Sequence, residues 1–161
     1  MSIPRQVDFG APVWEARASM IATVAVGTDG SATASKAVEA AIEIAQRFDA
    51  KLVLLSAFQG ADARPRGAKT GSEEVQWTFD NDARVREMLR RTEQELRDRK
   101  IECTTMVDEG DPADVLIRLA EECEADLIVI GNRGMQRRVL GSVPNTVTHK
   151  ATCSVYVVKT T

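Results

Sequence analysis

The sequence predicts an α/β fold, an open doubly wound parallel sheet of five strands in the order 3-2-1-4-5 with helices on both faces. Two observations lead to this prediction. Short runs rich in Val, Ile and Leu show little polar alternation, as strands do when both faces of a parallel sheet are covered. Segments with helical period separate these runs one by one, as in right-handed βαβ crossovers. The length of 161 residues suits one domain with a single core.

Five segments are predicted to be strands. Four are strongly apolar and span residues 21–26, 52–57, 126–130 and 154–158. Residues 102–107 alternate more between polar and apolar positions, which indicates a strand nearer an edge of the sheet. We expect the first and fourth strands, the most apolar of the five, to be central neighbours.

Four helices are predicted between these strands. Residues 33–48 carry small apolar residues at helical spacing, and residues 81–100 carry an apolar stripe among many Arg and Glu residues. Asp111 and Pro112 form a strong start for the third helix, because aspartate caps a helix and proline suits its first position. A last short helix is expected at residues 142–150.

Two irregular stretches surround this pattern. Residues 1–19 are predicted to be an N-terminal tail that precedes a domain of residues 20–161. Residues 59–78 contain several glycines, a proline and mixed charge, and they are too long for a tight connection. We expect this second stretch to be a flexible lid or a mobile surface loop.

Composition argues against several functional classes. The net charge of -3 and a pI of about 5.3 leave no basic surface for a nucleic acid. No apolar run reaches the roughly 18 to 20 residues that cross a bilayer, and the first residues lack a secretory pattern. Cys103, Cys123 and Cys153 form no CxxC pair and are expected to be buried thiols in a reducing compartment. A cytoplasmic protein with neither nucleic-acid nor membrane partners is therefore expected.

The first candidate binding loop is GTDGS, residues 27–31, directly after a predicted central strand. Ligands of doubly wound sheets bind at the carboxyl ends of the strands, where the strand order reverses. Gly27 and Gly30 permit a tight turn and close approach to a ligand. The carboxylate of Asp29 can accept hydrogen bonds from ribose hydroxyls. The alternative is that Asp29 and Ser31 only turn the chain and cap the first helix.

The second candidate loop, residues 131–143, follows the fourth predicted strand and reads GNRGMQRRVLGSV. Gly131 and Gly134 expose backbone N–H groups at the edge of the sheet. Gly141 and Ser142 open the last helix, whose unpaired N–H groups and dipole attract an anion. Three arginines add positive charge to this loop: Arg133, Arg137 and Arg138. These features favour an anion site over a solvated basic turn in which Ser142 only caps the helix.

In this order the motifs resemble the universal stress protein family. The resemblance rests on GTDGS, on Gly-x-x-Gly with a spacer and Gly-Ser-Val-Pro-Asn, and on CSVYVVK at the last strand. It covers residues 20–159. It implies a doubly wound fold with an adenine nucleotide (ATP, AMP or cyclic AMP) in the crevice between the first and fourth strands, and Mg²⁺ in the case of ATP.

The resemblance also implies roles for individual residues. The adenosine would be held by the first loop and two strand ends: Gly27, Thr28, Asp29, Ala57, Ile130 and Gly131. The aspartate would bind the ribose, the backbone of Ala57 would meet the adenine, and Ile130 would pack on the base. The phosphates would be surrounded by Arg133, Gly134, Gly141, Ser142 and Val143.

The spacer in the second loop departs from the family's ATP-binding pattern. That pattern has nine residues between the second glycine and the Gly-Ser pair, whereas this chain has six, MQRRVL. A shorter loop offers fewer backbone donors to the phosphates, which favours adenosine recognition over triphosphate recognition. Arg137 and Arg138 would compensate near the phosphate, or the site would take AMP or cyclic AMP.

The sequence thus leads to two functional hypotheses. The first is a stress-response regulatory protein in which an adenine nucleotide orders residues 59–78 and the arginine loop, and so changes the surface offered to an unidentified protein partner. Without a Walker-type lysine or a positioned base, it is not expected to be an enzyme beyond slow ATP hydrolysis. The alternative is a ligand-free module of the same fold. A homodimer through residues 154–158 is expected, because an apolar edge strand invites pairing.

Overall fold

The computed structural model describes residues 21–60, 73–132 and 140–159, with the backbone alone described for residues 73–80. The described residues form one parallel sheet of five strands in the order β3-β2-β1-β4-β5, which confirms the predicted topology. The strands are β1 (Thr23–Gly27), β2 (Lys51–Phe58), β3 (Thr104–Glu109), β4 (Leu127–Asn132) and β5 (Ser154–Lys159). β1 and β4 are central neighbours, as predicted.

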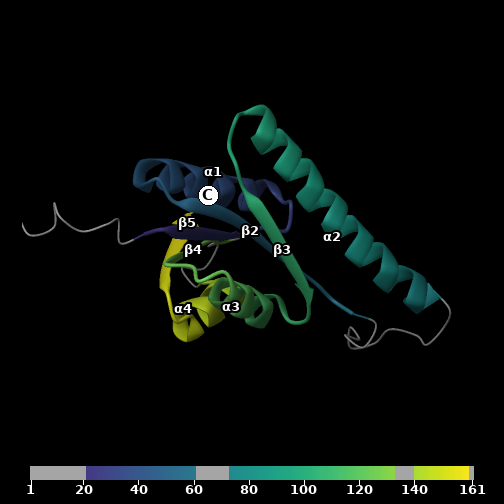
Figure 1. The fold of residues 1–161 in the computed structure, drawn as a ribbon. Coiled ribbons are helices and arrows are strands. Elements are labelled where there is room, and N and C mark those ends of the chain that lie inside the picture. Colours follow the sequence, from purple (N-terminus) through teal and green to yellow (C-terminus); the bar gives the residue numbers. More distant parts are fainter. Residues whose placement is uncertain (1–20, 61–72, 133–139, 160–161) are drawn as a thin grey trace, which may run out of the picture.

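Helices cover both faces of the sheet (Figure 1). In the described part of the chain they are α1 (Ala32–Phe48), α2 (Glu73–Asp98), α3 (Pro112–Glu122) and α4 (Ser142–Lys150). None of the helices described is long and apolar enough to cross a membrane. Their order along the chain, with a helix after each of the first four strands, matches the predicted alternation.

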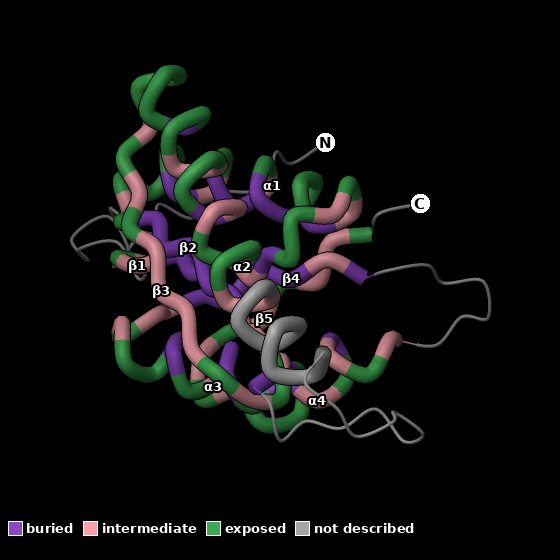
Figure 2. Tube along the Cα trace, turned by 90° about the vertical axis from the view of Figure 1, so that its right-hand side faces the viewer, coloured by how far each residue is buried: buried purple, intermediate pink, exposed green. Residues whose placement is uncertain are grey.

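Alternate residues of the central strands supply two separate cores. Val24 and Val26 point to one face and pack with the apolar residues of α1 and α2. Ala25, between them, points to the other face and packs with α3 and α4. All three residues are fully buried, and Figure 2 shows the buried part of the chain concentrated at the centre of the sheet.

Local capping explains where two of the helices begin. At the start of α1 the Ala34 N–H donates to Ser31 Oγ at 3.2 Å, and at the start of α3 the Ala113 N–H donates to Asp111 Oδ1 at 3.0 Å. Pro112 lies in the first turn of α3, where a missing N–H costs no helical hydrogen bond. The predicted helix start at Asp111 is therefore confirmed.

The helix predicted at residues 81–100 starts earlier than expected. α2 begins at Glu73, so residues 73–78 of the predicted loop are helical. The sequence of residues 73–80, EEVQWTFD, contains no Gly or Pro, and acidic residues are favourable near the positive end of the helix dipole. The rest of the predicted lid, residues 61–72, lies outside the described residues.

The edge strand β3 confirms one prediction and corrects another. Its place at one edge of the sheet agrees with the alternating pattern of residues 102–107. The strand itself runs from Thr104 to Glu109, two residues later than predicted, because it pairs with β2 from Val53–Thr104 to Phe58–Glu109.

The three cysteines are half-buried rather than buried, which corrects the sequence-based expectation. Cys123 follows the end of α3, and Cys153 lies directly before β5. Both pack at the margin of the core on the α3 side of the sheet. Cys103 packs at the margin of the other core. Partial burial raises the pKa of each thiol, so the protonated form is favoured at neutral pH.

Candidate functional site

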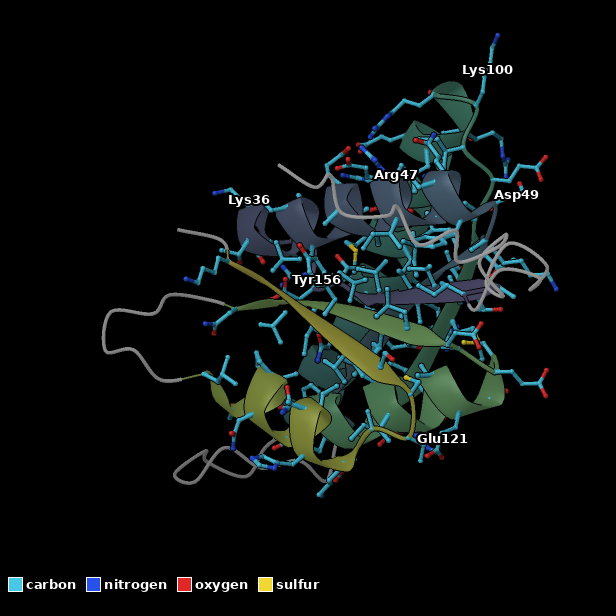
Figure 3. The ribbon with its side chains drawn as sticks, turned by 90° about the vertical axis from the view of Figure 1, so that its left-hand side faces the viewer. Lys36, Arg47, Asp49, Lys100, Glu121 and Tyr156 are labelled. Carbon is cyan, nitrogen blue, oxygen red and sulfur yellow. The ribbon has the colours of Figure 1, made fainter. Side chains whose placement is uncertain are left out.

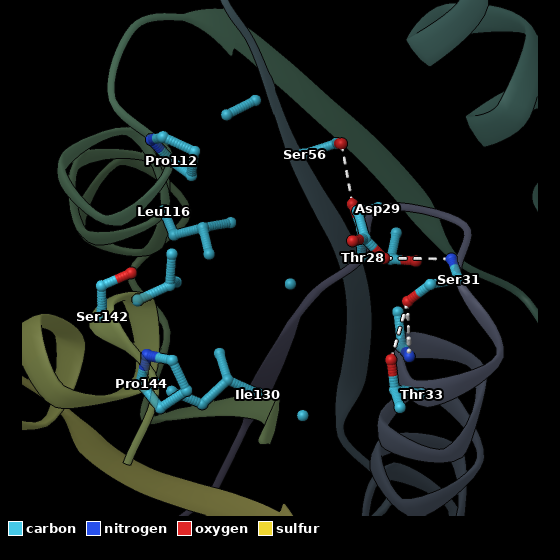
Figure 4. Close-up of a pocket in the computed structure, with 16 residues that line it drawn as sticks. Thr28, Asp29, Ser31, Thr33, Ser56, Pro112, Leu116, Ile130, Ser142 and Pro144 are labelled. Carbon is cyan, nitrogen blue, oxygen red and sulfur yellow. Dashed lines mark hydrogen bonds between the residues drawn. The ribbon is translucent and has the colours of Figure 1, made fainter. Parts of the chain in front are cut away.

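A cavity of about 440 Å³ opens between the carboxyl ends of β1 and β4 (Figure 4). This is the point at which the strand order reverses, where ligands of such sheets bind. Its volume lies within the range of roughly 300 to 1,000 Å³ that small-molecule sites occupy. The cavity is bounded by the loop after β1 on one side and by α3 and α4 on the other.

The loop after β1 is fixed to the neighbouring strand β2 by two hydrogen bonds. The Thr28 N–H donates to the Leu55 carbonyl at 2.9 Å, and Ser56 Oγ donates to the Thr28 carbonyl at 2.8 Å. Ser56 is only 2% exposed, so this second bond lies in a water-poor environment where it strongly restrains the loop. Thr28 is itself buried, and the residue after it is therefore presented from a rigid base.

Asp29 and Ser31 both shape the turn and line the cavity. The Ser31 N–H donates to Asp29 Oδ1 at 3.0 Å, which is the local turn that aspartate favours. Ser31 Oγ caps α1, so the structural roles expected for both residues are confirmed. Asp29 is exposed at the cavity and brings a carboxylate to its rim. The structural role and a binding role are thus compatible in Asp29.

The opposite wall is apolar. Leu116 from α3 and Ile130 from β4 form it together with Pro112. Gly27 faces this wall closely: a Cβ placed on it would lie 2.9 Å from Leu116 Cδ1 and 3.5 Å from Ile130 Cγ2. Gly27 therefore packs directly on Leu116, and the apolar side chains of this wall offer a surface on which an aromatic base can pack.

The N-terminus of α4 opens into the same cavity. Gly141 is the N-cap and has no side chain to cap the helix, and no acidic residue occupies the first turn. Ser142 is the first residue of the helix, so the alternative in which it only caps α4 is wrong. The Gly141 N–H donates to Asn132 Oδ1 at 3.2 Å, which anchors this end to β4. Ser142 and Val143 line the cavity at the positive end of the helix dipole, which is a position that favours an anion.

Every described residue that the sequence predicted for the site lines this one cavity. These residues are Gly27, Thr28, Asp29, Ala57, Ile130, Gly131, Gly141, Ser142 and Val143. The other predicted site residues, Arg133, Gly134, Arg137 and Arg138, lie outside the described residues.

Sequence reasoning missed several lining residues, chiefly Ser56, Pro112 and Leu116. Ser56 could have been found, because it is a polar residue near the carboxyl end of a buried apolar run. Leu116 gave no such signal, since its helical spacing predicts only a core position. It reaches the cavity because α3 begins at the same edge of the sheet where β1 ends.

The sequence model of the Universal stress protein family matches residues 20–159. The chain belongs to the universal stress protein family. A universal stress protein of Mycobacterium tuberculosis is 39% identical to it over 148 residues, which cover 86% of this chain and 97% of the relative.

Solved structures of universal stress proteins have the same fold. One, a universal stress protein in complex with cAMP, is 33% identical with a TM-score of 0.67, and the match covers 89% of this chain and 100% of that one. Another, a family member from Arabidopsis thaliana with AMP bound, has a TM-score of 0.63 over 86% of this chain and 92% of that one. At 20% identity, the Arabidopsis protein shows only that the fold is shared.

Proposed function

We propose that this universal stress protein is a stress-response regulatory protein that binds an adenine nucleotide in the cavity between β1 and β4. The observation that supports it most is that one cavity combines a carboxylate-bearing loop, an apolar wall and an open helix N-terminus. Asp29 would accept hydrogen bonds from the ribose. The base would lie against Leu116 and Ile130, and the phosphate would lie at the start of α4.

The comparison with a cAMP complex supports binding of an adenine nucleotide. That universal stress protein is 33% identical to this chain and is covered over its whole length. The six-residue spacer before the Gly-Ser pair is short for a triphosphate, so we infer a preference for a single phosphate group, as in AMP or cAMP, over ATP. Mg²⁺ would take part only if ATP binds.

The first test is calorimetric titration of nucleotide-stripped protein with AMP, cAMP and ATP in parallel, the last with and without Mg²⁺. We expect AMP or cAMP to bind more tightly than ATP. Titration with adenosine, which lacks the phosphate, measures how much the phosphate contributes to the binding free energy. Titration with GMP measures the selectivity for the base. If none of these nucleotides gives heat or raises the melting temperature, the protein is instead the ligand-free interaction module.

We also infer a homodimer through β5, the outer strand next to β4. Val155 and Val157 pack on the α3 side, so Tyr156 between them points to the opposite face. Tyr156 is 48% exposed although it is large and lies on an edge strand (Figure 3). A second copy that pairs along β5 would cover it, which removes an edge that otherwise invites uncontrolled association.

Tyr156→Lys is expected to convert this dimer to a monomer, because a charged residue on an edge strand opposes pairing. Light scattering after size-exclusion chromatography measures the mass of both forms. Phe48→Lys is the matched control, since Phe48 is the other exposed large hydrophobic side chain of the described residues, at 45%, and lies at the end of α1. A monomeric wild-type protein, or equal dissociation of both variants, would contradict a β5 interface.

The proposed role is regulatory rather than catalytic. Turnover of ATP to ADP should be slow at most, which chromatography of the titration mixtures would reveal. A cytoplasmic location and an unidentified protein partner remain predictions from the sequence.

A further inference from the structure

A second cavity lies on the other side of the loop that carries Asp29. It has a volume of about 530 Å³ and is formed between α1 and α2. Thr28 and Gly30 belong to its lining, together with Val38 of α1 and Met88 of α2. Thr28 also lines the proposed nucleotide cavity. One short loop therefore forms part of the wall of both cavities.

α2 contacts this loop through Met88. Gly30 has a φ of 73°, and a Cβ placed on it would lie 2.8 Å from Met88 Cγ. The Gly30 N–H donates to Thr28 Oγ1 at 3.2 Å, so the turn that contacts Met88 is joined to the residue shared by the two cavities. Asp29 lies between these two positions. The side chain of Met88 thus packs directly against the turn that presents the carboxylate.

The rest of α2 anchors Met88 to the body of the protein. Leu89 and Leu96 are 3% and 2% exposed and belong to the core that α2 shares with α1. Just beyond the helix, Arg99 donates to both carboxylate oxygens of Glu39 on α1 at 2.6 and 2.9 Å. Hydrogen bonding to Arg99 holds the pKa of Glu39 below its usual value, so this pair is charged at neutral pH. Met88 can then move away from Gly30 only by a change of its own conformation or by a shift of α2.

We propose that Met88 is a positioning residue for the nucleotide site and that α2 therefore responds to nucleotide occupancy. This inference rests on the proposed function. A nucleotide that fixes Asp29 also fixes the turn against which Met88 packs. Linkage is reciprocal. If a bound nucleotide changes the affinity of a partner for α2 by some factor, the bound partner changes the nucleotide affinity by the same factor. α2 is then the element through which nucleotide occupancy reaches the protein surface.

The test compares AMP and cAMP binding of the wild type with Met88→Ala. We expect the alanine variant to bind roughly 5- to 10-fold more weakly, at the low end of usual coupling between sites. Met88→Leu should restore affinity to within about twofold, because a swap of similar volume keeps the packing. Val85→Ala is the matched control: Val85 is a half-buried apolar residue of α2 that lines neither cavity, and its loss should leave affinity unchanged.

Hydrogen exchange gives a second readout, and its main arm uses the wild type alone, so it holds even if a variant fails to fold. Adding AMP or cAMP should slow exchange in residues 84–96 as well as in residues 27–31, and Met88→Ala should abolish only the effect on α2. If the wild type binds nucleotide but α2 exchange is unchanged, or if Val85→Ala weakens binding as much as Met88→Ala, the inference is wrong while the proposed function stands. If the wild type binds neither nucleotide, both are overturned.

Discussion

Replacing Asp29 by alanine is expected to weaken AMP binding by roughly 10- to 150-fold, the equivalent of about 1.5 to 3 kcal/mol for a hydrogen bond to a charged group. The carboxylate lies at the rim of the cavity, where it would accept from the ribose hydroxyls. The loss should be smaller for cAMP than for AMP. Only the 2′-hydroxyl of cAMP is free, because its 3′-oxygen is bonded to the phosphate. Titration calorimetry of the two nucleotides measures both losses.

Two controls separate ligand binding from the structural role of Asp29. Asparagine keeps an Oδ1 that can accept from the Ser31 N–H, so Asp29→Asn should preserve the turn but lose the charge-assisted bond to the ribose. Asp98→Ala removes an exposed carboxylate at the end of α2, outside the cavity, and should leave affinity unchanged. Unchanged affinity in Asp29→Ala would show that the ribose does not lie at this loop.

Gly27→Val is the second variant with a large expected effect, in this case by filling the cavity. The added Cβ would meet the end of the Leu116 side chain at 2.9 Å, and the added volume would press on the apolar wall against which the base is proposed to lie. Overpacking of this kind costs about 1 to 3 kcal/mol of folding stability. Where the bound base needs the same space we expect a loss of affinity of similar size, roughly 5- to 150-fold, for every adenine nucleotide. Calorimetry with AMP, cAMP and adenosine should show the same loss for all three, because the base is common to them.

The fold should survive this substitution, because Gly27 ends a strand and does not lie in the left-handed region that requires glycine. Ala22→Val is the matched control: it adds bulk directly before the other end of the same strand, at an exposed position outside the cavity. The melting temperature of Ala22→Val should lie near that of the wild type, and that of Gly27→Val should fall by roughly 2 to 12 °C. A larger fall for Gly27→Val would mean that misfolding, and not the filled cavity, causes the lost affinity.

Most of the fold was predictable, because its signals are local. The first four residues of β4, Leu127 to Ile130, form an unbroken apolar run, and Asp111 with Pro112 marks a helix start within two residues. The start of α2 at Glu73 has no such local signal in the sequence. The glycines and the proline of residues 60–71 indicate a loop, and nothing in residues 73–80 forms a clear apolar stripe that would separate helix from loop.

From residue types alone the site was predictable only on the side built from loops, whereas Ala57 and Ile130 were assigned through the family resemblance. Asp29 and Gly141 occur in short motifs whose residue types are unusual outside turns and helix starts. Pro112 and Leu116 of the opposite wall look like ordinary helix residues in the sequence. Their place in the cavity depends on the crossing of α3 over the sheet, which is a property of the tertiary structure. The contact between Met88 and Gly30 was hidden for the same reason.

The pairing of β1 with β4 has a consequence for how the protein is made. Thr23 and Asp126 are 103 positions apart, and the Asp126 carboxylate accepts the N–H of Thr23 beside this pair of strands. Contacts between such distant segments form slowly, since a long loop must close first. Gly27 is synthesised early and Ser142 late, so a ribosome-bound chain that still lacks β4 and α4 has only one half of the cavity. A nucleotide bound as proposed would therefore stabilise the completed protein, but it would not assist the early steps of its folding.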